Sequence, residues 1–193
     1  MKKLHLLLIA VFIFALTNAN AQIDQNSVMI GGGLAASSTE GSTDQTDSES
    51  TNNFLINLNP KIGYFFIDNF AAGLGIEYTY NTEDSDGNVT TSDLLAGPFG
   101  RDYFPLGESS AFFAELNVVF GSTNIDDEQQ DVSTSLFGLG IGPGFTIFAN
   151  ESIGIEGIVR YNYITGSTDI DGNSVGLTIN EFDFLVGVQF YLN

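Results

Sequence analysis

Alternation of apolar and polar residues runs through most of this 193-residue chain and constrains its fold more than any other feature. Ile56 and Leu58, for example, alternate with Asn57 and Asn59. A period of two residues places successive side chains on opposite faces of a β-strand. The pattern therefore predicts eight two-faced strands, at about 26–37, 53–66, 70–81, 89–103, 110–121, 133–148, 152–165 and 175–192.

The connections between these segments alternate between long and short. The long ones are acidic and rich in Gly, Asn, Ser and Thr, and lie at roughly 38–52, 82–88, 122–132 and 166–174. The short ones lie at roughly 67–69, 104–109 and 149–151. Long external loops and short periplasmic turns are typical of outer-membrane barrels. We therefore predict an all-β fold, an eight-stranded antiparallel up-and-down transmembrane β-barrel in the outer membrane, with both termini in the periplasm.

A soluble barrel with its apolar face inward would show the same alternation. The polar faces, however, hold Gly, Asn, Thr and isolated charges rather than the many Lys and Glu residues of a solvated surface. Aromatic residues also gather near both ends of the strands, as Phe66 does at a short turn and Tyr163 near a long loop. Such rings form the interfacial girdles of spanning barrels. A soluble ligand carrier is the less favoured alternative.

Both ends of the chain carry patterns of export or assembly signals. Lys2-Lys3 precedes an apolar stretch, and Ala19-Asn20-Ala21 has the small-x-small pattern of a signal-peptidase site. We therefore expect a signal peptide at 1–21 and a barrel domain at 22–193. The spacing of the last aromatic and apolar residues resembles the signal that barrel-assembly machinery reads, so that machinery is an expected partner during biogenesis.

Charge and residue types exclude several functions. Without the leader, three basic residues remain against 24 acidic ones, which makes nucleic acid an implausible partner. The only histidine, His5, would leave with the leader, and the chain contains no cysteine. Nucleophilic sites of the Ser/His and Cys/His types are thereby excluded from the mature protein. A carboxylate pair such as Glu115 and Glu156 remains for acid/base chemistry, but we expect neither enzymatic activity nor a cofactor.

The main candidate site is a set of charges on the faces predicted to line the lumen. Side chains fill the interior of an eight-stranded barrel, and isolated charges there are costly, so pairing is favoured. Pairing across the first short turn sets Lys61 diagonally near Glu77. The predicted lumen ion network comprises Lys61, Glu77, Arg101, Glu115, Glu156, Arg160 and Asp183.

Two functions are compatible with such a lumen. If the network closes it, the protein has a structural role or contacts an unknown surface partner through its acidic loops. If the ion pairs of the network can separate, the barrel is a narrow pore for ions or small solutes. The first is the prediction and the second is the alternative.

Two loop runs, at 84–88 and 169–173, begin like calcium-binding loops with alternating carboxylates. Neither has the distal Glu of such a loop, and Asp-Gly-Asn is also a tight-turn signal. We therefore predict no metal site, and keep four weak candidates, Asp84, Asp86, Asp169 and Asp171. An alternative role for the acidic loops is to bind divalent cations that bridge lipopolysaccharide.

Two strand-turn-strand stretches carry a family resemblance. The sequences PKIGYFFIDNFAAGLG at 60–75 and GPFGRDYFP at 97–105 resemble the small porin-like outer-membrane β-barrel family common in Bacteroidetes. The family's pattern often has two aromatic residues after the arginine, and Asp102 replaces the first of them here. The resemblance implies the barrel fold and a setting of outer-membrane lipid and lipopolysaccharide, and most members of this family have no assigned activity.

Overall fold

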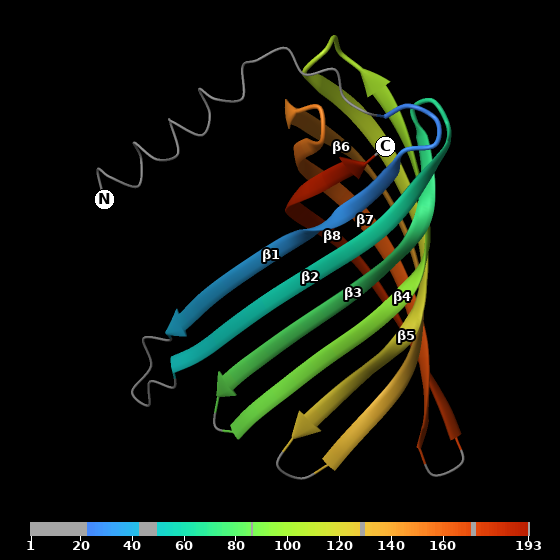
Figure 1. Ribbon diagram of the computed structural model, residues 1–193. Coiled ribbons are helices and arrows are strands. Elements are labelled where there is room, and N and C mark those ends of the chain that lie inside the picture. Colours follow the sequence, from blue (N-terminus) through green and yellow to red (C-terminus); the bar gives the residue numbers. More distant parts are fainter. Residues whose placement is uncertain (1–22, 43–49, 86, 128–129, 171–172, 193) are drawn as a thin grey trace.

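The computed structural model describes residues 23–42, 50–85, 87–127, 130–170 and 173–192, which form a closed antiparallel barrel (Figure 1). Each strand pairs with the next, and β8 pairs with β1. Among the described residues, no helix is long and apolar enough to cross a membrane. The strands are β1 (Val28–Ser42), β2 (Ser50–Ile67), β3 (Phe70–Ser85), β4 (Gly87–Pro105), β5 (Ser110–Asp127), β6 (Gln130–Asn150), β7 (Ile153–Ile170) and β8 (Asn173–Leu192).

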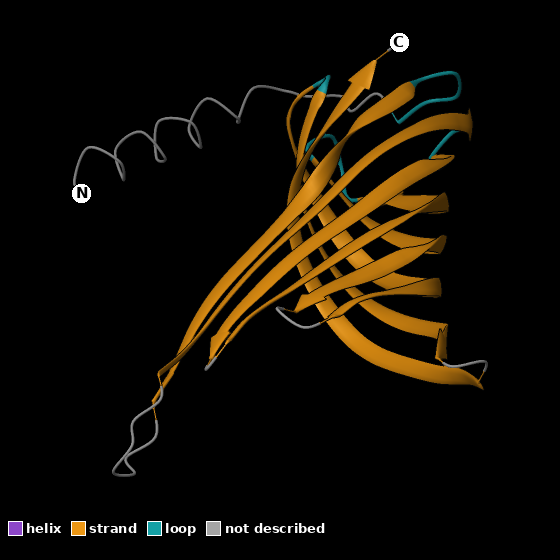
Figure 2. Cartoon of the chain, turned by 90° about the horizontal axis from the view of Figure 1, so that it is seen from below, coloured by secondary structure: helices purple, strands orange, loops and turns teal. Residues whose placement is uncertain are grey.

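The two ends of the barrel differ. One end, called the turn end here, carries the connections at 68–69, 106–109 and 151–152 together with the start of β1 and the finish of β8. The opposite end is called the loop end. The strands fan out toward the loop end, as Figure 2 shows.

The predicted fold class is confirmed, but the predicted strand boundaries at the loop end are wrong. The β5–β6 ladder continues to the pair Asp127–Gln130, within the segment expected to be a loop. The β7–β8 ladder likewise continues to Ile170–Asn173. These extensions hold only scattered apolar residues, such as Ile125 and Val132, among many Ser, Thr, Asn and Asp residues. The regular alternation therefore ends before the backbone ladder does. Within the described residues, the β5–β6 and β7–β8 hairpins therefore project at the loop end.

The outward face of every strand is apolar along the middle of the barrel. Leu34, Ile62, Leu74, Leu116 and Ile141 are all exposed there. Exposed tyrosines lie nearer the strand ends and include Tyr64, Tyr78, Tyr80, Tyr161 and Tyr163. An apolar band between aromatic rings is the exterior expected of a barrel in a bilayer.

Three prolines on the outward face interrupt the strand ladders. The β2–β3 pairing is broken at Pro60, the β4–β5 pairing at Pro98 and the β6–β7 pairing at Pro143. Proline has no N–H to donate to a ladder. Near Pro60 the Asn59 side-chain amide donates to the Ile76 carbonyl at 3.4 Å, which compensates in part.

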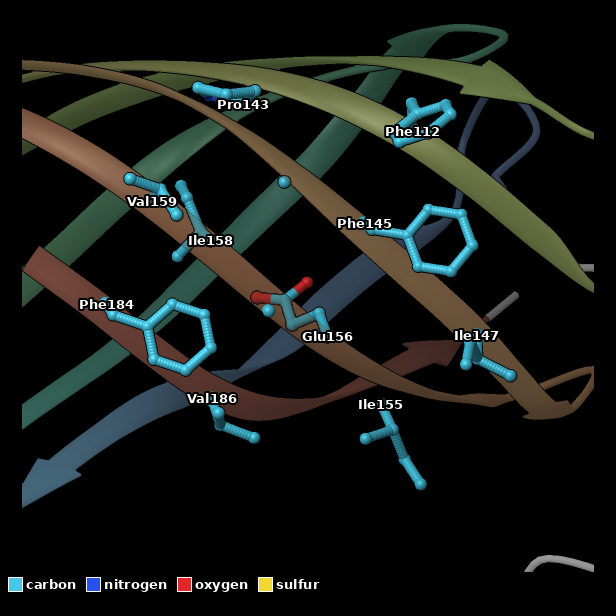
Figure 3. A pocket seen from close by; sticks show the side chains of 12 residues that line it. Phe112, Pro143, Phe145, Ile147, Ile155, Glu156, Ile158, Val159, Phe184 and Val186 are labelled. Atoms are coloured by element: carbon cyan, nitrogen blue, oxygen red, sulfur yellow. The ribbon is translucent and has the colours of Figure 1, made fainter.

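Shallow apolar hollows on the outward face lie over two of these prolines. One has a volume of about 480 Å³ and lies around Pro143, where Figure 3 shows Phe112, Phe145 and Val159 on neighbouring strands. The other has a volume of about 680 Å³ and lies around Pro60. Both hollows open toward the surroundings of the barrel rather than along its axis.

A row of glycines makes room inside the barrel. Gly138, Gly140, Gly142 and Gly144 alternate along the inward face of β6. A Cβ atom on Gly144 would collide with the Phe113 ring. The space that β6 leaves empty is thus filled by large side chains leaning over from β5 and β7, at the close packing typical of protein interiors.

We expect Gly144→Ala to destabilise the barrel, because its new Cβ overlaps the Phe113 ring. Overpacking of this kind costs about 1–3 kcal/mol. Gly157→Ala is the matched control, since its nearest heavy atom would be the Leu185 carbonyl oxygen at 3.9 Å. Urea unfolding in lipid vesicles measures both variants. Equal midpoints would show that the glycine row is not required for packing.

Candidate functional site

A group of four charges lies on the turn side of the lumen and is called the turn-side cluster. Arg101 is its centre and is completely buried. Its Nη2 lies 2.6 Å from Glu115 Oε2, and its Nη1 lies 2.6 Å from Glu156 Oε2. Lys61 Nζ donates to both Glu115 oxygens at 2.8 Å. Two cations and two carboxylates balance formally, which is the condition under which buried charges are tolerated.

Strand register explains part of this geometry. Glu115 lies directly opposite Arg101 in the β4–β5 ladder. Glu156 and Lys61 come from β7 and β2, which are not neighbours of β4. The long Arg101 and Lys61 side chains therefore cross the lumen, and the cluster joins strands that share no ladder.

An aromatic plug closes the barrel between this cluster and the turn end. The Arg101 guanidinium carbon lies 4.0 Å from the centre of the Phe113 ring, and Arg101 Nη1 donates to the Tyr103 hydroxyl at 3.0 Å. Cation–π and hydrogen-bond contacts thus connect the charges to the plug. The side chains of the plug are at most 2% exposed and belong to Met29, Phe65, Tyr103, Phe113, Phe148 and Tyr191.

A second group of charges, called the loop-side cluster, surrounds Arg160. Its Nη1 lies 2.6 Å from Glu77 Oε1, and its Nη2 lies 3.2 Å from Asp183 Oδ2. Asn117 donates to the same Glu77 oxygen at 2.8 Å, and Asn162 donates to Asp183 at 2.6 Å. One cation faces two carboxylates, so the formal charge of this cluster is 1 − 2 = −1.

Little space remains between the two clusters. A cavity of about 10 Å³ lies there, and its walls include Lys61, Glu77, Glu115 and Arg160. A cavity of that size holds one water molecule at most. Side chains therefore occupy the lumen at the plug, at the turn-side cluster and up to the loop-side cluster.

All seven charges of the predicted network lie on inward faces and take part in the two clusters. Lys61 and Glu77, which were expected to lie near each other, do not form an ion pair. Lys61 instead contacts Glu115, and Glu77 contacts Arg160. The diagonal estimate considered only strands joined by a turn. These side chains instead reach across the barrel, because the interior is narrow.

Several polar partners were missed by the sequence reasoning. Tyr103 and Tyr191 meet hydroxyl to hydroxyl at 3.1 Å, and the Gln189 amide donates to Glu156 at 2.8 Å. Each lies at an inward position of its strand. The alternation of inward and outward positions along each strand was the signal that could have identified Gln189 and Asn117.

The four weak metal candidates lie near the ends of two strands or outside the described residues. Asp84 and Asp169 lie on β3 and β7 rather than in loops, whereas Asp86 and Asp171 lie outside the described residues. No group of three or more His, Cys, Asp or Glu side chains among the described residues is arranged to hold a metal ion.

We expect Glu115→Gln to destabilise the barrel strongly, because Arg101 and Lys61 would lose their shared carboxylate. Removing one member of a buried ion pair typically costs about 3–5 kcal/mol. Glu151→Gln, on an exposed turn, makes the same chemical change and should stay within about 0.5 kcal/mol of wild type. Urea midpoints in vesicles measure both, and equal midpoints would contradict a stabilising role for the cluster.

Comparison with solved structures supports the fold. Outer membrane protein OprG from Pseudomonas aeruginosa is 15% identical, with 91% of this chain and 99% of that chain covered and a TM-score of 0.54. Neisserial surface protein A is also 15% identical, with 85% and 94% covered and a TM-score of 0.51. At such identities the similarity concerns the fold alone. No curated protein matches the sequence.

A family model identifies the chain more directly. The model of the outer membrane protein beta-barrel domain matches residues 6–190, which is nearly the whole sequence. The match agrees with the apolar exterior and the closed eight-stranded sheet. The chain therefore belongs to the outer membrane protein β-barrel domain family and resides in the outer membrane.

Proposed function

We propose that this protein is a closed, non-enzymatic barrel that acts in the envelope through its structure and through the acidic surface of its loop end. The observation that carries this proposal is the filled lumen. A hydrated ion moving along the axis would have to separate Arg101 from Glu115 and Glu156. Leaving those charges buried without partners is energetically unfavourable.

The aromatic plug adds a second barrier on the same path. Phe65, Tyr103 and Tyr191 pack at ring-centroid distances between 5.8 and 6.4 Å. Opening a pore would require these rings to move as well as the ion pairs. The ion pairs and the aromatic plug together therefore favour the structural or surface role over the pore alternative.

The loop end supplies the surface for contacts. Glu83 and Asp126 are exposed there, and acidic residues outnumber basic ones 24 to 5 in the whole chain. Such a surface favours cationic partners and repels anionic ones. In this proposal lipopolysaccharide is contacted through divalent cations that bridge its anionic groups to these carboxylates. Loop protease sensitivity that is unchanged by a chelator would contradict this contact.

The types of residue in the chain support the proposal that the barrel is not an enzyme. After residue 21 the sequence contains neither histidine nor cysteine. Glu115 and Glu156, the carboxylate pair considered for acid/base chemistry, both bind Arg101. Their lone pairs are thereby engaged, which supports a structural use of both side chains.

We expect purified wild-type protein to give no stable conductance steps in planar lipid bilayers. Lys61→Ala should also remain silent, because Arg101 still binds Glu115 and Glu156 and still contacts the plug. A general porin reconstituted in the same way confirms that the membranes report channels. Steady steps from wild type whose size changes in Arg160→Ala would instead establish the pore.

We further propose that residues 1–21 are removed on export and that the turn end faces the periplasm. The short turns and both termini of the barrel share that end, which supports this orientation. Mass spectrometry of the outer-membrane protein should give Gln22 as its first residue. An epitope inserted between residues 46 and 47 should react with antibody on intact cells, whereas one inserted between residues 107 and 108 should not. The reverse labelling would invert the orientation.

A further inference from the structure

The barrel is closed by a short ladder between β1 and β8. Their described register runs only from Val28–Leu192 to Leu34–Val186. Both strands continue toward the loop end, and each remains paired with its other neighbour there. In Figure 1 the loop end of β1 lies at the left, whereas the red β7–β8 hairpin lies at the lower right. A seam with two free strand edges therefore separates β1 from β8 in the loop half of the barrel.

Part of this seam lies at the depth of the membrane. Tyr161, on the outward face of β7, donates to Asn180 of β8 at 2.6 Å, and exposed tyrosines mark the membrane–water interface. Residues 181–185 of β8 lie between that level and the paired segment. Their free backbone edge thus faces hydrocarbon, where unpaired N–H and C=O groups find no water.

The outward side of the free β8 edge is strongly apolar. Phe182 and Phe184 are 75% and 65% exposed, the two highest values among the large apolar side chains of the described residues. No neighbouring strand covers them on the seam side, because β1 has diverged. A bound segment could therefore place its own apolar side chains beside these two rings.

The inward side of the same edge is acidic. Glu181 and Asp183 alternate with the two phenylalanines. Arg160 is already shared by Glu77 and Asp183. The seam therefore combines a free strand edge with an uncompensated negative charge.

We propose that the seam binds an extended cationic peptide by strand addition to β8. The backbone of the peptide pairs with the free edge, and its apolar residues lie beside Phe182 and Phe184. Its Lys or Arg residues, at alternate positions, point inward to Glu181 and Asp183. The two-residue period of a strand matches this arrangement of apolar and acidic positions.

Other occupants fit these observations less well. A second copy of the chain that paired through β8 would bring Glu181 and Asp183 of both copies together, which is electrostatically unfavourable. A lipid acyl chain covers the phenylalanines but offers no hydrogen-bond donor or acceptor to the edge. An alternating cationic strand satisfies the edge, the rings and the carboxylates at once.

The probe for this proposal is a synthetic peptide of alternating Lys and Val with one terminal Trp. The protein contains no tryptophan, so peptide emission reports binding without background from the protein. A matched peptide with Pro in place of a central Val keeps the charge but disrupts strand pairing. In non-ionic detergent micelles we expect saturable binding of the first peptide and loss of binding for the second. Equal binding of both peptides would overturn strand addition.

Two variants test the charge. Glu181→Gln should weaken peptide binding by about threefold to tenfold, the range expected for losing one ion pair of about 1 kcal/mol. Glu151→Gln removes the same charge at the opposite end of the barrel and should leave the affinity unchanged. An equal effect of both variants would reduce the interaction to nonspecific attraction between opposite net charges and would overturn the site.

Disulfide capture locates the peptide, because the chain has no cysteine of its own. A peptide carrying one Cys should be captured by Phe184→Cys and not by Leu116→Cys, whose side chain is also exposed but lies on β5. Equal capture at both positions would overturn binding at the seam. Rapid dimerisation of Phe184→Cys without peptide, together with no peptide capture, would assign the seam to a second copy instead.

Discussion

Hydrogen bonding of the backbone within hydrocarbon is the constraint on which the rest of this structure depends. Water is absent there, so each strand must find its partners in neighbouring strands, and the sheet must close on itself. The β1–β8 ladder achieves closure in the turn half of the barrel. Where that ladder stops, two strand edges are left without partners, and another strand can pair with them. Closure and the proposed binding seam thus have one physical origin.

Closure also determines what the lumen contains. Lipid occupies the apolar side of each strand, so the polar side is enclosed, and eight strands leave room for little more than side chains. Arg101, Lys61 and Arg160 can remain charged in that space only because carboxylates lie within hydrogen-bonding distance. The glycines of β6 supply the missing volume on one wall. A filled lumen is the result of these requirements together.

The two halves of the barrel differ in how their inward charges are balanced. The turn-side cluster is formally balanced and rests on the aromatic plug. The loop-side cluster carries an excess carboxylate and lies next to the exposed Glu181. Balanced buried charges therefore lie near the turn end, and the excess negative charge lies nearer the loop end. This division accords with a barrel that acts through its surface.

Much of the fold could be predicted from the sequence by itself. The sequence also predicted that the charged side chains of the strands point into the barrel. Period-two alternation is a local property, so it determined eight two-faced strands and placed residues such as Lys61 and Arg160 on the polar face. It did not determine that Lys61 would meet Glu115, that β5 and β6 would stay paired to Asp127–Gln130, or that β1 and β8 would separate after Leu34. Only the tertiary structure decided these features, because they depend on how the curvature and stagger of the sheet bring distant strands together across the lumen.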